Sequence, residues 1–319
     1  MAALERPAAR ADAEHVGLEA TLWRVALLAG YGAGAREIAR RLAAVTRSGG
    51  GRSCLEAGAP LQLTVDAPGA ALLRVGVRLG DDLSDPSLAG LMPPAALRSV
   101  RAYLAPLPRA RHSSLGAWLF WSERQHSVFV DLRDPVPADA LGRLEGILDA
   151  DQRTRLARLA ALREYARPWA LRVDAGEHGV GKVHLHWLIE RGQAPAAVAE
   201  LIAPGAWRHA VGVLGNLLRR PESSGRWVVA TPLDAISEPA LRLGTTGWAL
   251  APEEPPDDDR KHRAVAEVMR SLDGPRDYAE ALWSMCRGAA LPGWRVGRAC
   301  ELRVRGDSVR ARLFFTPQT

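Results

Sequence analysis

Polar and apolar residues alternate strictly within residues 181–190. Lys182, His184 and His186 are separated by single apolar residues. Successive side chains of a β-strand point to opposite faces, so a strand here places the cationic and imidazole groups on one face and the apolar groups on the other. The pattern predicts one packed face and one face that meets an anionic group.

Similar strand patterns recur in pairs along the chain. The five predicted hairpins are 54–65 with 70–79, 115–122 with 126–133, 169–174 with 182–190, 226–232 with 240–250, and 294–304 with 309–315. Helical spacing of apolar residues lies between them, in 16–44, 93–104, 138–165, 195–218, 262–271 and 278–287. Hairpins and helical blocks therefore alternate throughout.

This alternation is an internal repeat of about 55 to 60 residues. A single hairpin is marginally stable, so the five need to join into one sheet, and closure of that sheet removes its edges. We expect an α+β fold, a ten-stranded antiparallel β-barrel built from five repeated helix and hairpin units, with the helices outside. Residues 16–319 would form this single domain after a flexible segment, 1–15. An open sheet split into two domains is the alternative that the 319 residues also allow.

Cationic residues share one face of the second strand in four of the five hairpins. They are Arg74, Arg78, Lys182, His184, His186, Arg242, Arg310 and Arg312. Inside a barrel such charges need solvent or a ligand, because unpaired buried charge is costly, and Arg and Lys both suit phosphate oxygens. The pattern indicates a diphosphate site. The alternative is that these strands face outward and the charges are solvated.

Carboxylates and aromatic residues complete the candidate lining. Glu56 and Glu301 are the acidic candidates for accepting a proton or holding a donor. Aromatic residues at strand spacing either shield a cation or belong to the core. These aromatic candidates are Trp118, Phe120, Phe129 and Phe314.

Composition narrows the class of partner. The formal net charge is +6 and the isoelectric point is near 9.8, yet Lys182 and Lys261 are the only lysines. Such an arginine bias is more typical of genomic base composition than of a nucleic-acid footprint, so we expect no nucleic acid. Three scattered cysteines predict reduced thiols in a cytoplasmic protein. No apolar run approaches the ~20 residues of a membrane span, so we expect no membrane association.

Three short patterns are similar to known metal- or phosphate-binding motifs, but the neighbouring residues do not fit those motifs. Residues 81–85 have the Asp-Asp-x-x-Asp spacing of Mg²⁺-diphosphate sites, but a loop is expected where that motif needs a helix. Residues 176–182 have phosphate-loop spacing, but Val183 follows where Ser or Thr is needed, and the next element is a strand. His184 and His186 lack an identifiable third metal ligand.

The chain resembles the ABBA-type prenyltransferases, and is most similar to the cyanobactin-type peptide prenyltransferases. The resemblance rests on residues 55–57 with Arg74 on the returning strand, on 291–297 at the entry to the last hairpin, and on 310–315. It implies an enzyme that transfers a dimethylallyl or geranyl group from its diphosphate, with Mg²⁺, to a nucleophilic side chain of a ribosomally made, often cyclic, peptide. We expect a monomer or weak dimer.

The resemblance also implies residue roles. Arg74 and Arg312 match diphosphate-binding positions, and Glu56 matches the glutamate that orients or deprotonates the acceptor. Lys182, His184, Arg242 and Arg310 are assigned to the diphosphate from their alternation alone. One departure is that all four tyrosines fall in or at the ends of predicted helices, so Phe or Trp would shield the cation. A catalytically silent barrel that binds a peptide or nucleic acid through a basic lumen or rim is the competing hypothesis.

Overall fold

A computed structural model describes most of the strands and part of the helical regions. The described residues are 19–20, 23, 32–37, 39–40, 43, 61–67, 74–79, 92–105, 117–121, 126–132, 142, 144–176, 178–189, 198, 201, 227–234, 240–244, 294–305 and 308–317. For 61–67, 74–79, 117–121, 131, 227, 240–244, 294–305 and 308–317 this description covers the backbone alone.

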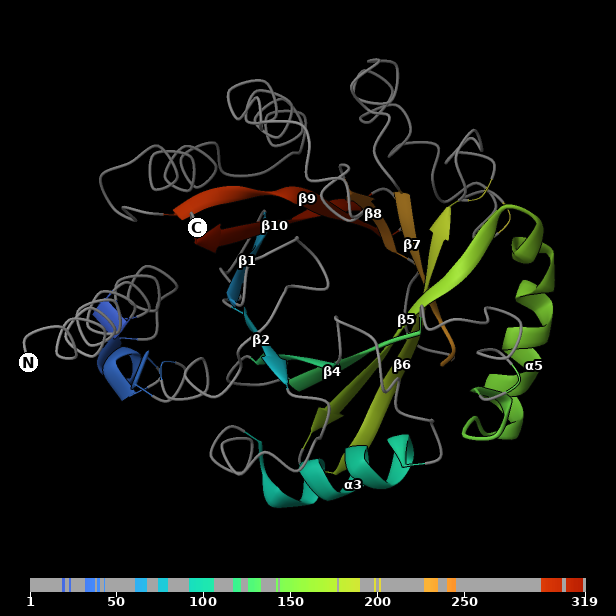
Figure 1. The fold of residues 1–319 in the computed structure, drawn as a ribbon, viewed down its shortest axis with the longest axis horizontal. Helices are drawn as coiled ribbons and strands as arrows, with labels where there is room; N and C mark the ends of the chain where they lie inside the picture. The colour runs from blue at the N-terminus through green and yellow to red at the C-terminus, as the bar shows by residue number, and fades with distance from the viewer. Residues whose placement is uncertain are drawn as a thin grey trace, which may run out of the picture.

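Ten antiparallel strands form the sheet (Figure 1). They are β1 (Leu61–Ala67), β2 (Arg74–Leu79), β3 (Ala117–Trp121), β4 (His126–Asp131), β5 (Ala166–Gly176), β6 (Gly179–Ile189), β7 (Trp227–Pro232), β8 (Ala240–Gly244), β9 (Trp294–Arg305) and β10 (Ser308–Pro317). Each strand pairs with its sequence neighbours, and β10 pairs with β1, so that the order closes into a barrel. All five predicted hairpins coincide with an antiparallel pair.

The longest hairpin joins β5 to β6. We expected its first strand to begin at Trp169, but β5 begins at Ala166 and includes Pro168. The register shifts between Pro168 and Ala170, because proline has no N–H to donate to the ladder and is accommodated by an irregularity. At the turn, Gly179 has a φ of 110°, a conformation open mainly to glycine. The strand that follows rules out the phosphate-loop interpretation.

Two described helices lie outside the barrel (Figure 1). Helix α3 (Pro94–Leu104) starts after Pro93, close to the predicted start, and buries Ala96, Leu97 and Val100. It lies against β5 and β6. Helix α5 (Ala150–Arg158) continues into a 3-10 helix, η3 (Leu159–Glu164). A short 3-10 turn, η1, covers Gly32–Gly34, within the block 16–44 that has helical spacing.

The helical block predicted over 138–165 is interrupted at Asp149. The Asp149 carboxylate accepts from the Gln152 N–H at 2.8 Å, and the Gln152 side chain accepts from the Asp149 N–H at 3.2 Å. This capping box starts a new helix, which the apolar spacing alone does not reveal. Tyr103 donates to the Gln152 side chain at 3.3 Å, tying α3 to α5. Burial, helped by the Asp149 carboxylate, raises the pKa of Tyr103 to about 12.

The outer face of β5–β7 forms the described core. Val183, Leu185 and Trp187 are completely buried. The Trp187 Nε1–H donates to the Thr231 hydroxyl at 2.9 Å, and that hydroxyl donates to the Leu185 carbonyl at 3.1 Å. The apolar half of the alternation therefore packs as predicted, and its polar atoms have partners. Among the described helices, none is long and apolar enough to cross a membrane.

Candidate functional site

The register places most of the predicted site residues on one face of the barrel. Residues directly opposite each other in an antiparallel pair share a face of the sheet. Arg242 is opposite Glu301, Glu301 is opposite Arg312, and Arg312 is opposite Asp66. These four positions form a row across β8, β9, β10 and β1, in which cationic and acidic residues alternate. Arg242 and Arg312 were predicted, and Glu301 was one of the two acidic candidates.

A second pairing brings two cationic positions together. Arg310 of β10 is directly opposite Arg303 of β9. Like charges at directly opposite positions are destabilising unless something offsets them. Arg310 and Arg312 are two residues apart in a strand, so they share a face with this pair and with the row. An anion is the ligand that such positions favour.

The aromatic candidates occupy the same face on neighbouring strands. Trp118 of β3 lies between Arg78 of β2 and Phe129 of β4, and Phe120 lies opposite Ser127. Arg74 is opposite Thr64, which in turn is opposite Phe314. The backbone register therefore joins the predicted cationic and aromatic positions into one continuous wall.

Side chains of this wall are described on β4, β5 and β6. Arg172 and His184 are at opposite register positions, as are Phe129 and Arg172. Arg172, Asp174 and His184 are all buried. The Arg172 Nε–H donates to Asp174 Oδ1 at 2.6 Å, and its Nη2–H donates to Oδ2 at 2.9 Å. The Arg172 guanidinium carbon lies 5.8 Å from the centre of the Phe129 ring.

The Arg172–Asp174 pair is held ionised. Burial alone would raise the pKa of Asp174, and the charge and hydrogen bonds of Arg172 oppose this rise. The charge of His184 and the hydroxyl of Ser127 act in the same direction, and together they hold the pKa of Asp174 below its ordinary 3.8. The described wall thus contains a fixed, buried ion pair.

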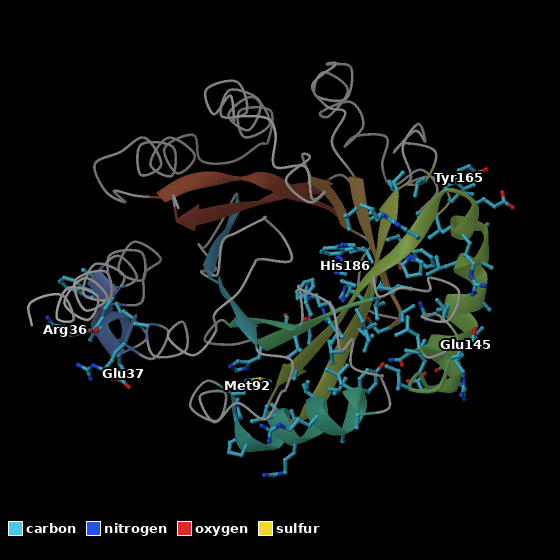
Figure 2. All side chains as sticks on the ribbon, in the orientation of Figure 1. Arg36, Glu37, Met92, Glu145, Tyr165 and His186 are labelled. Atoms are coloured by element: carbon cyan, nitrogen blue, oxygen red, sulfur yellow. The ribbon has the colours of Figure 1, made fainter. Side chains whose placement is uncertain are left out.

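His186 forms an aromatic cluster beside this pair. Its ring centre is 5.1 Å from that of Phe129 and 6.1 Å from that of Trp169. Only 1% of His186 is exposed. Figure 2 shows His186 on the side of the strands that faces the barrel interior, opposite to the side covered by helices. The imidazole face of β6 is therefore a packed inner wall.

The other predicted site residues differ in exposure and in whether the structure describes them. Lys182 is exposed, whereas His184 is buried beside Asp174. The side chains of Arg74, Trp118, Phe120, Arg242, Arg310, Arg312 and Phe314 lie outside the described part, as does residue Glu56 entirely. The motif at 81–85 also lies outside it.

Arg172 and Asp174 were not predicted as site residues. The predicted cationic face came from the second strands of the hairpins, whereas both residues belong to the first strand of the third hairpin. The available signal was a pair of opposite charges at positions i and i+2, which alternate along the strand with Leu171 and Val173. Alternation at that spacing puts both side chains on one face.

Comparison with known proteins gives no match to a family model and no match to a curated protein. Solved structures do match. A 6-dimethylallyltryptophan synthase from Micromonospora olivasterospora, solved with DMASPP and Trp, aligns at a TM-score of 0.65 and 14% identity, covering 94% of this chain and 96% of that one. PriB with product diphosphate aligns at 0.62 and 17%, covering 95% and 96%.

A third similar structure is NotF in complex with brevianamide F and DMSPP. It aligns at a TM-score of 0.61 and 14% identity, covering 94% of this chain and 93% of that one. NotF is described as a prenyltransferase. At these identities the likeness establishes the fold. This chain has the barrel fold of the aromatic prenyltransferases.

Proposed function

We propose that this protein is a prenyltransferase that moves a dimethylallyl or geranyl group from its diphosphate to an aromatic side chain, most suitably the indole of a tryptophan-containing peptide. The observation that carries the proposal is the inner wall of the barrel, where the register aligns Arg242, Arg310 and Arg312 on one face. The shared fold adds that similar barrels were solved with isoprenoid diphosphate analogues or with diphosphate.

The cationic positions would bind the diphosphate as it leaves. Breaking the bond between the allylic carbon and its oxygen places negative charge on the diphosphate, and fixed cations stabilise that charge in the transition state. Arg310 opposite Arg303 is the pair whose mutual repulsion an anion would relieve. Arg74, on β2, would contribute from the other side of β1. Lys182 and His184 stay candidates for the same role.

The aromatic positions would protect the allylic cation. Aromatic faces attract cations and exclude water, which would otherwise capture the cation as an alcohol. Phe129 is the described example, because it is buried on the inner face of the barrel. Trp118 is directly opposite Phe129 on β3, and Phe120 and Phe314 occupy the same face. None of these positions is a tyrosine.

Attack by the acceptor ring forms the new carbon–carbon bond and leaves a proton to be removed. Glu56 is our candidate for that base, from its resemblance to the family's glutamate. A carboxylate near the acceptor suits the task because it is ionised at neutral pH. This assignment concerns a residue outside the described part and rests on the sequence alone.

The described residues contain no group of three or more His, Cys, Asp or Glu side chains that could hold a metal ion. The buried carboxylate of Asp174 already accepts two hydrogen bonds from Arg172. The involvement of Mg²⁺ stays a prediction, which activity measured with EDTA against added Mg²⁺ would test.

The acceptor class is inferred from two sources. The similar structures were solved with Trp and with brevianamide F, which favours an aromatic acceptor. The sequence resemblance favours a peptide. A tryptophan side chain within a ribosomally made peptide satisfies both.

The decisive experiment is a transfer assay. The protein is incubated with dimethylallyl or geranyl diphosphate, with and without Mg²⁺, and with L-tryptophan, tryptophan-containing linear and cyclic peptides, and matched peptides that carry leucine instead. Mass spectrometry should show a gain of one prenyl unit on tryptophan-containing acceptors only. A protein that binds the diphosphate analogue but modifies none of these acceptors would instead be the catalytically silent barrel.

A further inference from the structure

We infer that Arg172 is an acceptor-binding residue: held in place by Asp174, it donates a hydrogen bond from its remaining guanidinium N–H groups to a carbonyl or carboxylate oxygen of the acceptor. This inference rests on the proposed function, because it concerns the acceptor of that reaction. It assigns a role to a described, buried residue that the sequence did not single out.

Arg172 has more hydrogen-bond donors than its bonds to Asp174 use. A guanidinium has five N–H donors in a fixed fork. Within the described part of the chain, Arg172 uses Nε and Nη2 for Asp174. Nη1 has no hydrogen bond to any described residue, although only 4% of Arg172 is exposed. Within the described part, Nη1 is not among the fully buried polar atoms that lack a hydrogen bond, so its N–H groups are placed to meet a ligand in the barrel interior.

The charges of Arg172 and Asp174 restrict the kind of ligand that they can bind. Asp174 is ionised and neutralises Arg172 at close range, so the pair carries no net charge. A multiply charged diphosphate gains little from a neutral pair and is repelled by its carboxylate. A carbonyl oxygen, or a singly charged carboxylate, needs only the donors. The pair therefore suits the acceptor better than the prenyl donor.

Arg172 and the arginines of β10 lie on opposite walls of the barrel. In the closed order, β5 and β10 are five strands apart in either direction, so they form opposite walls. A barrel of ten strands is roughly 20 Å across. Arg172 is folded along its own wall, bonded two residues ahead and lying over Phe129. A diphosphate held by the arginines of β10 would be beyond its reach, whereas an acceptor between the two walls would not. His184, which is opposite Arg172 in register, would then face the acceptor and not the diphosphate.

The test measures binding and needs no turnover. The parent and variants are saturated with a thiolodiphosphate analogue of dimethylallyl diphosphate and titrated calorimetrically with three indoles. L-Tryptophan supplies a carboxylate, L-tryptophanamide supplies an amide carbonyl, and tryptamine supplies neither. The main variant is R172Q with D174N, which removes the guanidinium without leaving a buried charge unpaired. R172K is a second variant that keeps the ion pair, and R153Q, on the exposed face of α5, is the control.

Loss of one hydrogen bond from a charged donor should weaken tryptophanamide or tryptophan about tenfold in R172Q with D174N. Tryptamine should change by less than about twofold, and R153Q should match the parent. Loss with tryptophan alone identifies a carboxylate partner, and loss with both identifies a carbonyl.

Three results would overturn the inference. They are equal weakening of all three indoles, weaker binding of the thiolodiphosphate analogue itself, and a parent protein that shows no preference for the carbonyl-bearing probes, including one that binds none of them. Failure of the proposed function is a separate result, since it would appear as absent prenyl transfer while this binding difference persists.

Discussion

At the scale of single residues, the best-defined chemistry is the ion pair between Arg172 and Asp174. Two hydrogen bonds of 2.6 and 2.9 Å fix it, and both partners are buried. Removing one partner of a buried pair leaves an uncompensated charge, which costs about 3–5 kcal/mol. This is why paired substitutions are the appropriate probes of these residues.

The pair should make stability depend on pH in the acid range. The pKa of Asp174 is lower in the folded protein than its ordinary 3.8, so the folded state binds this proton less tightly than the unfolded state. The stabilisation is complete above about pH 5 and is lost as the pH falls through the folded pKa. Urea unfolding should therefore show a shallower decline of unfolding free energy with acid in R172Q with D174N than in the parent.

The control for this measurement is D151N, because Asp151 is an exposed carboxylate on α5. Its acid dependence should match that of the parent. Equal slopes for the parent and the paired variant would mean that Asp174 does not titrate differently in the two states.

At the scale of secondary-structure elements, the turn between β5 and β6 depends on one glycine. Gly179 has a φ of 110°, and a Cβ added there would lie 3.2 Å from the Ser99 hydroxyl of α3. Both effects oppose a side chain, and a non-glycine residue in a sparsely populated backbone region costs about 1–3 kcal/mol. The position couples the hairpin to the helix that covers it.

Gly179→Ala should lower the melting temperature by several degrees, measured by circular dichroism. Gly181→Ala is the matched control, because among the described residues a Cβ there would meet the Asp174 carbonyl, at an ordinary 3.7 Å. Adding Ser99→Ala to Gly179→Ala should recover only part of the loss, since the backbone strain remains. Equal melting temperatures for the two glycine variants would contradict this explanation.

Elements with strong local signals were predictable from the sequence. Alternating polar and apolar residues, with turn residues between them, predicted the hairpins. Apolar residues at helical spacing after Pro93 predicted α3. The break at Asp149 in the helical block 138–165 was not predicted, because a capping box depends on polar residues and leaves the spacing of the apolar residues unchanged. The pairing of Arg172 with Asp174 was missed because both residues lie on the first strand of their hairpin. Its significance also depends on Phe129 and His184 from neighbouring strands.

The register between neighbouring hairpins could not be predicted from the sequence either. Alternation predicts which residues share a face of one strand, but not which residue of the next hairpin stands opposite. The positions of Glu301 between Arg242 and Arg312, and of Asp66 beside Arg312, come from those pairings. They show that acidic positions interleave with the predicted cationic ones.

At the scale of the whole molecule, the barrel distributes cationic positions over several strands. Arg74 and Arg312 come from β2 and β10, on either side of β1. If they bind one diphosphate, single substitutions to alanine should each weaken a diphosphate analogue about tenfold, the loss of one charge-assisted contact. Lys182, which is exposed, should matter less.

Isothermal titration at two salt concentrations would measure these effects. Binding by the parent should weaken as salt rises, and the arginine variants should show a smaller salt dependence. R153A, on the exposed face of α5, serves as the control. If R74A, K182A and R312A all bind the analogue as tightly as the parent, the assignment of the diphosphate to this wall is wrong.

The pairing of β1 with β10 also sets an order of events during synthesis. The strand that completes the barrel is the last of the ten to leave the ribosome, while its partner β1 is the first. Until then β1 has β2 on one side and an unsatisfied edge on the other, which can pair with a foreign strand. Nascent chains that stall before residue 308 should therefore recruit chaperones more strongly than chains released after β10.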